Sequence, residues 1–162
     1  MNLDITAEAS PAYQWPAGGS ENFVATYGRF YTYYAVTDSR GICPTGWHAP
    51  NDSEWETMKA FLGGDAVAGG KVKEAGTAHW NAPNTGAEGP NGNESGFTAL
   101  PAGYRSVAGD FVSLQVTGYF WSTSTNPTPG MAWGQGLHYN DAILLRGGYY
   151  NNDGVPVRCL KN

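Results

Sequence analysis

Charged residues are scarce in this sequence. Only 14% of its 162 residues are Asp, Glu, Lys or Arg, against about a quarter in a typical globular domain, and the formal net charge is −5. No cluster of Lys and Arg is present, so the chain lacks the basic face that nucleic acids and anionic lipid surfaces require. The charge balance therefore argues against nucleic-acid binding and disfavours docking on anionic lipid.

Long apolar runs and closely spaced metal ligands are missing as well. No segment approaches the ~20 apolar residues of a transmembrane helix, so we expect no membrane insertion. Met1–Ser10 has neither the basic start nor the apolar core of a signal peptide, and we interpret Met1 as an excision point within a longer protein. His48, His79 and His138 are far apart in sequence, and we expect structural or surface roles for them rather than a zinc site.

The chain has two cysteines, Cys43 and Cys159, and their spacing excludes the Cys-x-x-Cys motif of zinc ribbons and thioredoxin-like proteins. Their number alone fits one long-range disulfide as well as two buried thiols. Glycine (23 residues) and aromatic side chains (14%) are abundant, which indicates a loop-rich fold with a core built largely from rings.

One helix is clearly predicted. Asn51 can cap it, and Glu54 can reach back to the cap as in a capping box. Trp55, Met58 and Leu62 then form one apolar face, and Gly63-Gly64 ends the helix after about three turns.

The other elements are short. We expect a strand over residues 29–36, a turn over 38–41, a second helix or a strand within 65–75, and a long loop over 76–95. Together with the capped helix, the predicted strands indicate one α+β domain over residues 13–162, after a lead-in segment over residues 1–12. The further strand candidates are Phe97–Leu100, Gly103–Ser106, Asp110–Val116, Tyr119–Ser124, Met131–Leu137, Ala142–Leu145 and Val155–Leu160.

Several motifs, in one order from about Tyr13 to the end, resemble the Fibrobacter succinogenes major paralogous domain family. They are Tyr27-Gly28-Arg29-Phe30-Tyr31 through Tyr34-Ala35-Val36, Gly41-Ile42-Cys43-Pro44-Thr45-Gly46-Trp47-His48-Ala49-Pro50 running into Glu54-Trp55, Ala68-Gly69-Gly70-Lys71-Val72-Lys73-Glu74, His79-Trp80-Asn81, Asn93-Glu94-Ser95-Gly96-Phe97-Thr98-Ala99-Leu100-Pro101-Ala102-Gly103-Tyr104-Arg105, Trp121-Ser122-Thr123-Ser124, Ala132-Trp133 and Val157-Arg158-Cys159.

The resemblance implies a C-type-lectin-like fold, related to formylglycine-generating enzymes and to the variable proteins of diversity-generating retroelements. It also implies a secreted or cell-surface protein of Bacteroidota or their relatives, and a disulfide between Cys43 and Cys159, as such folds commonly have. It does not fix one activity, because fold alone does not determine function.

Enzymatic chemistry has little support in the sequence. The formylglycine-generating relatives depend on a reactive cysteine pair in the C-terminal part of the domain, where this chain has Cys159 alone. Ser122 and Ser124 have no evident His/Asp pair to activate them, and Asp110, Asp141 and Asp153 are interpreted as turn residues. We therefore expect a protein that is not an enzyme and carries no cofactor.

Calcium is also not expected. Glu88-Gly89-Pro90-Asn91 interposes a glycine in the Glu-Pro-Asn motif of calcium-dependent lectins, and their later Trp-Asn-Asp is missing. If calcium were bound, Glu88, Asn91 and Asp153 would be the first ligands to test.

The C-terminal part of the chain is rich in residues typical of adaptable recognition surfaces. We expect Trp133 in the core and Tyr139, Tyr149 and Tyr150 exposed, so that this face binds a surface protein or a glycan. The predicted contacts are His138, Tyr139, Asn140, Asp141, Arg146, Tyr149, Tyr150, Asn151 and Asn152.

Three functions remain open at this point. The leading one is a binding module, which could be diversified by a retroelement. The alternatives are an enzyme related to the formylglycine-generating enzymes and a structural subunit of a surface or phage fibre.

Overall fold

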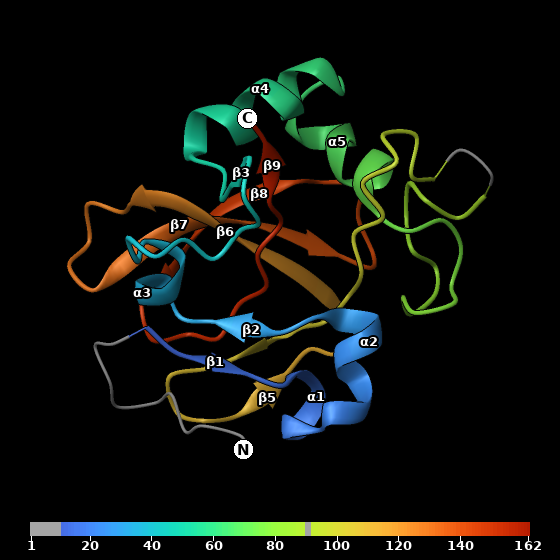
Figure 1. Ribbon diagram of the computed structural model, residues 1–162. Helices are drawn as coiled ribbons and strands as arrows, with labels where there is room; N and C mark the ends of the chain where they lie inside the picture. The colour runs from blue at the N-terminus through green and yellow to red at the C-terminus, as the bar shows by residue number, and fades with distance from the viewer. Residues whose placement is uncertain (1–10, 90–91) are drawn as a thin grey trace.

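The computed structural model describes residues 11–89 and 92–162 and has an α+β architecture around a central antiparallel sheet. The sheet has the strand order β6-β7-β8, and three two-stranded ribbons, β1–β2, β3–β9 and β4–β5, surround it (Figure 1). The strands are β1 Tyr13–Gln14, β2 Phe30–Tyr31, β3 Trp47–His48, β4 Tyr104–Arg105, β5 Phe111–Val112, β6 Thr117–Thr125, β7 Met131–His138, β8 Leu145–Tyr150 and β9 Leu160–Lys161. The helices are α1 Pro16–Gly19, η1 Glu21–Phe23, α2 Val24–Tyr27, α3 Tyr33–Val36, α4 Asp52–Phe61 and α5 Asp65–Val72.

The predicted helix is confirmed as α4. The Asn51 side chain accepts a hydrogen bond from the Glu54 backbone N–H at 3.1 Å, and the Glu54 carboxylate accepts one from the Asn51 N–H at 2.9 Å. Trp55 and Leu62 are buried, and the chain leaves the helix through Gly63 and Gly64, both at positive φ. The segment left open between helix and strand, residues 65–75, forms α5.

Each face of the sheet carries its own core. The face toward α4 and α5 packs Trp55, Trp80 and Phe120 together. The opposite face packs Trp121 against Tyr33, and the Trp121 indole N–H donates to the carbonyl of Tyr31 at 2.6 Å. In Figure 1 the two long helices, α4 and α5, lie above the sheet, and the β1–β2 ribbon and β5 lie below it. Rings therefore supply much of both cores, as the composition indicates.

Several predicted strands need correction. Only Phe30 and Tyr31 of the expected strand 29–36 pair with β1, because the chain turns into α3 and buries Tyr33 and Val36. The strand expected at Ala142–Leu145 is instead β8, which begins at Leu145. Residues 97–100 contribute a single bridge, between Ala99 and Lys73. The predicted strands 110–116 and 155–160 shrink to β5 and β9, whereas β6 and β7 extend slightly beyond their predicted ranges.

The Cys43–Cys159 disulfide is confirmed. It joins residues 116 positions apart, with an S–S distance of 2.02 Å, and it fixes the last part of the chain to the segment before α4. β9 then pairs with β3, where Leu160 lies opposite His48. Of the predicted lead-in, only Pro11 and Ala12 belong to the described residues. The Ala12 carbonyl accepts from the Thr32 backbone N–H, and the Ala12 N–H donates to the Thr32 hydroxyl.

Replacing Trp55 with alanine should lower the free energy of unfolding by about 3–5 kcal/mol, because its ring fills the space against Phe97 and Phe120. Phe61→Ala is the matched control, since that ring is 88% exposed on the same helix and its loss should change stability by less than about 0.5 kcal/mol. Urea denaturation of both variants checks this. Equal stabilities of the two variants would contradict the assigned helix face.

The double variant Cys43→Ala/Cys159→Ala should lose up to about 4–5 kcal/mol of unfolding free energy, since the disulfide closes a loop of more than 100 residues in the unfolded chain. The measurement is denaturant unfolding of the variant beside the oxidised and the reduced wild type. The reduced wild type should match the variant, and an unchanged midpoint in both would contradict the expectation.

Candidate functional site

Side-chain alternation along β7 and β8 decides which C-terminal residues can meet a partner. Trp133 lies opposite Gly148 and Gln135 lies opposite Arg146. Because alternate residues of a strand share a face, Trp133, Arg146 and Tyr150 lie on one face and Tyr149 lies on the other. The predicted contacts on β8 are thus divided between the two faces.

Tyr149 was expected to be exposed, and the structure instead packs its ring, partly buried, against the core that contains Trp121. The ring packs edge-on against Tyr119 and Trp121, with centroids 5.2 and 6.0 Å away. Glycines make this position accessible: a Cβ at Gly134 would lie only 2.8 Å from the ring, and one at Gly136 only 2.9 Å from the hydroxyl. Burial raises the pKa of Tyr149. The Tyr149→Ala variant should therefore have a lower free energy of unfolding than the wild type. Substitution of an exposed contact residue should leave that free energy nearly unchanged.

Trp133 differs from its prediction in the opposite sense. It is half-buried rather than part of either core, and the guanidinium of Arg146 stacks on it, with Cζ 3.5 Å from the ring centroid. Asp52, at the start of α4, holds the same guanidinium through Nε at 2.7 Å and Nη2 at 2.6 Å. The Asp52 hydrogen bonds raise the pKa of Arg146, so its charge is permanent. The result is a cation fixed in place between a ring and a carboxylate.

Tyr150 completes what we call the β7/β8 surface, which consists of Trp133, Arg146 and Tyr150. Tyr150 is 55% exposed, as expected for a contact residue. Its backbone N–H donates to the Asp153 carboxylate at 2.9 Å, so the strand end is fixed while the ring is free to meet a partner.

Four other predicted contacts, His138 to Asp141, lie at the far end of the sheet. His138 ends β7 and is followed by Tyr139, Asn140 and Asp141, whereas Tyr150 pairs with Met131 at the start of β7. Seven strand residues separate the two ends, or roughly 20 Å at the usual rise per residue. Asn140 is exposed, but Tyr139 packs against the core beside α5 and is only partly exposed.

Buried Lys73 fixes this far turn. Its ammonium donates to three backbone carbonyls, those of Thr85, His138 and Asp141, at 2.9, 3.0 and 2.8 Å. Burial lowers the pKa of Lys73 to about 8. No local sequence signal distinguishes Lys73, at the end of α5, as the residue that binds these carbonyls.

Asp153, the last calcium candidate, is buried and already engaged. It accepts hydrogen bonds from the Val107 and Tyr150 backbone N–H groups at 3.0 and 2.9 Å. Asn151 and Asn152 form the turn that leads to it, and both are partly exposed. Within residues 11–89 and 92–162, no three His, Cys, Asp or Glu side chains are grouped so that they could hold a metal ion. Glu88 accepts from the Gly86 N–H, and Asn91 lies outside the described residues.

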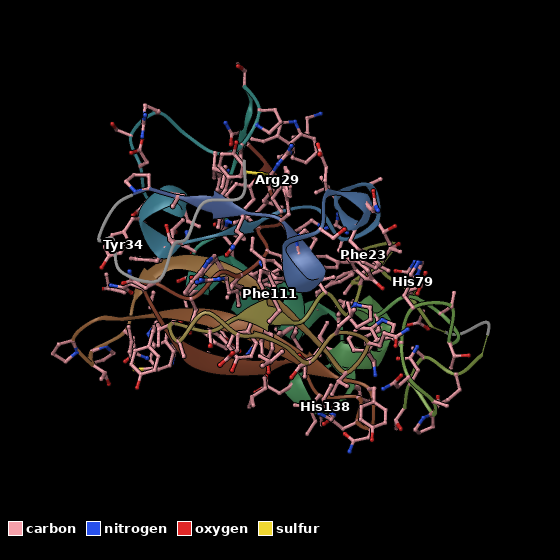
Figure 2. The ribbon with its side chains drawn as sticks, turned by 90° about the horizontal axis from the view of Figure 1, so that it is seen from below. Phe23, Arg29, Tyr34, His79, Phe111 and His138 are labelled. Atoms are coloured by element: carbon pink, nitrogen blue, oxygen red, sulfur yellow. A yellow bond between two sulfur atoms is a disulfide. The ribbon has the colours of Figure 1, made fainter. Side chains whose placement is uncertain are left out.

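The histidines occupy three separate places, each with a local partner. His48 contacts Glu54 and Asn162, His79 contacts Glu74, and His138 contacts Asn140. Figure 2 shows His79 and His138 on different parts of the molecule. Structural or surface roles fit these contacts.

An apolar groove that sequence reasoning missed lies between α4 and β9. Its volume is about 380 Å³, and its lining combines residues from before α4, from α4, from residues 96–97 and from the last strand. Long-range contacts, including the disulfide and the β3–β9 pairing, bring these segments together, so no local sequence signal could have found the groove.

Comparison with known proteins gives one match. The Fibrobacter succinogenes major domain profile matches residues 4–161. No curated protein and no solved structure matches the chain. Among the described residues, no helix is long and apolar enough to cross a membrane.

Asp153 should give the domain a distinctive pH dependence. Burial raises its pKa to about 6 from an ordinary 3.8. Between these values the folded protein binds more protons than the unfolded chain, so the unfolding free energy falls as pH rises and is constant above the window. The difference in stability between wild type and Asp153→Asn should change by about 3 kcal/mol between pH 3.5 and 7.

Chemical denaturation at several pH values measures this difference, with Asp110→Asn as the control, because Asp110 is exposed. The control should keep the wild-type pH profile. A wild type and an Asp153→Asn variant with parallel profiles would contradict the assignment.

Proposed function

The chain belongs to the Fibrobacter succinogenes major domain family, and we propose that it is a non-catalytic, extracytoplasmic binding module of C-type-lectin-like fold. It recognises a surface protein or glycan through the β7/β8 surface. The observation that carries the proposal is the Arg146 guanidinium, stacked on Trp133 and held by Asp52.

This arrangement suits recognition because its geometry exists before a partner arrives. Ordering a long side chain on binding costs about 0.5–1.5 kcal/mol, and Asp52 and Trp133 have already removed much of that freedom from Arg146. Arginine and aromatic side chains are also the residues that most often dominate binding energy. The exposed Tyr150 ring adds a flat surface on the same face for a sugar ring or an apolar side chain.

The distance between the two groups of exposed C-terminal residues favours a large partner. A ligand that touches both Tyr150 and Asn140 must span roughly 20 Å along the strands. A protein surface, which typically buries about 800 Å² per partner, covers that distance, as does an oligosaccharide, whereas a single sugar does not.

The state of the cysteines supports a non-catalytic role. The single C-terminal cysteine, Cys159, is bonded to Cys43 and so cannot supply the reactive pair of the formylglycine-generating relatives. The same disulfide supports an extracytoplasmic location, since such bonds persist in oxidising compartments. Diversification by a retroelement remains a hypothesis, and a template repeat beside the gene would support it.

Glycan and surface-protein arrays, run with and without EDTA, should identify a partner whose binding is independent of EDTA. Trp133→Ala, Arg146→Ala and Tyr150→Ala should each weaken that binding by about 1–2 kcal/mol or more, with little change in melting temperature for Tyr150→Ala.

Tyr13→Ala and Arg40→Ala are the matched controls, because both side chains are exposed and lie outside the β7/β8 surface. They should bind like the wild type. Full binding by all three surface variants, or loss of binding in EDTA, would reject the proposal as stated.

A further inference from the structure

The groove between α4 and β9 combines an apolar floor with half-exposed walls. Trp55 and Phe97 form the floor, with ring centroids 5.9 Å apart. Trp47 of β3 and Leu160 of β9 also line the groove and remain 45% and 42% exposed. The remaining lining residues are Pro50, Glu54, Met58, Gly96, Arg158 and Cys159.

The walls of this groove are rigid. The capping box fixes the start of α4, and the disulfide at Cys159 fixes β9 beside β3. His48 joins the two walls, since its ring contacts Glu54 on α4 at 2.8 Å and Asn162 beyond β9 at 2.6 Å. A ligand would therefore meet a cavity that is already formed.

Apolar surface continues beyond the groove along α4. Phe61 lies one turn beyond Met58 on the same side of the helix, and it is 88% exposed. Contiguous exposed apolar patches larger than a few hundred Å² are uncommon on monomeric proteins and mark interaction sites when they occur. Trp47, Leu160 and Phe61 together extend the apolar area beyond the size of one small ligand.

One charge in the groove has no counterpart. The Arg158 guanidinium lies over the Phe97 ring, 4.4 Å from its centroid, and donates to the Phe97 carbonyl. Loss of hydration there lowers the pKa of Arg158. Among the described residues, no carboxylate forms an ion pair with it. The nearby Glu54 carboxylate has both oxygens engaged, by His48 and by the Asn51 N–H.

We propose that this groove is a second binding site, which takes a peptide segment of a protein partner. The segment places a large apolar side chain on the Trp55–Phe97 floor and a carboxylate against Arg158. This proposal is independent of the β7/β8 surface, because none of Trp133, Arg146 and Tyr150 lines the groove.

A peptide fits these observations better than a small molecule does. Small-molecule sites enclose most of the ligand surface, whereas here Trp47 and Leu160 leave the groove open on one side. A peptide can bury an anchor in the groove and still cover Phe61 on the adjoining helix face. Arg158 then selects sequences with Asp or Glu near the anchor.

The test uses a phage-displayed library of random twelve-residue peptides, selected on the intact protein, followed by affinity measurements with synthetic peptides from the selection. The enriched peptides should carry an aromatic or branched aliphatic residue within a few positions of Asp or Glu. Trp47→Ala and Leu160→Ala should each weaken their binding by roughly tenfold or more. Arg40→Gln should have no effect, whereas its match Arg158→Gln should cost roughly tenfold.

Reversing the charge at position 158 tests whether Arg158 selects the acidic residue of the peptides. Arg158→Glu should lose the acidic peptides and regain affinity for versions in which Lys replaces the acidic residue. Trp133→Ala and Tyr150→Ala should bind the peptides like the wild type, so failure of this site is distinguishable from failure of the β7/β8 surface. The proposal is overturned if no enriched peptide depends on Trp47 and Arg158, or if free indole-3-acetate binds the groove as tightly as the peptides.

Discussion

Burial of both faces of the β6–β7–β8 sheet is the constraint on which the rest of the structure depends. A three-stranded sheet in a chain this rich in loops leaves few side chains free, because one face must meet α4 and α5 and the other the N-terminal ribbons. Trp121 shows the consequence: it is fully buried, and its indole N–H is satisfied by the Tyr31 carbonyl. Side chains remain available to a partner only where the covering elements end.

That constraint explains which parts could be predicted from the sequence. The helix α4 could be, because its cap, its apolar spacing and its glycine stop are all local signals. The aromatic and β-branched residues of segment 29–36 predict a strand. Tertiary packing instead buries Tyr33 and Val36, and these residues form the helical turn α3. β8 was missed because Gly147-Gly148 resembles a turn, although these glycines are extended and Gly147 makes room for the Tyr149 hydroxyl.

In the candidate site, too, local sequence signals could be predicted and long-range contacts could not. Residue type and position in the chain were sufficient to predict that Tyr150 is exposed and to select Arg146 as a candidate contact. They were not sufficient to assign faces, since Tyr149 and Tyr150 differ by a single position and point to opposite sides of the sheet. The partner of Arg146 is Asp52, which is 94 residues away in sequence. The groove beside α4 depends on an even longer connection through Cys159. Contacts of this range are set by the topology, and one sequence does not reveal them.

Main-chain contacts hold the far turn, which consists of residues His138–Asp141. Lys73 grips the His138–Asp141 turn through backbone carbonyls alone, and the Thr85 N–H bonds to the Tyr139 carbonyl in the same manner. Every residue type supplies a carbonyl, so these contacts do not depend on the type of side chain. The side chains of the turn have contacts of their own, since His138 contacts Asn140 and the Asp141 carboxylate accepts from the Ile143 N–H. Tyr149 is different, because the glycines at positions 134, 136 and 147 fit that ring and no larger neighbour. The shape of the far turn is thus held by main-chain hydrogen bonds, whereas the packing around Tyr149 depends on glycines at three positions.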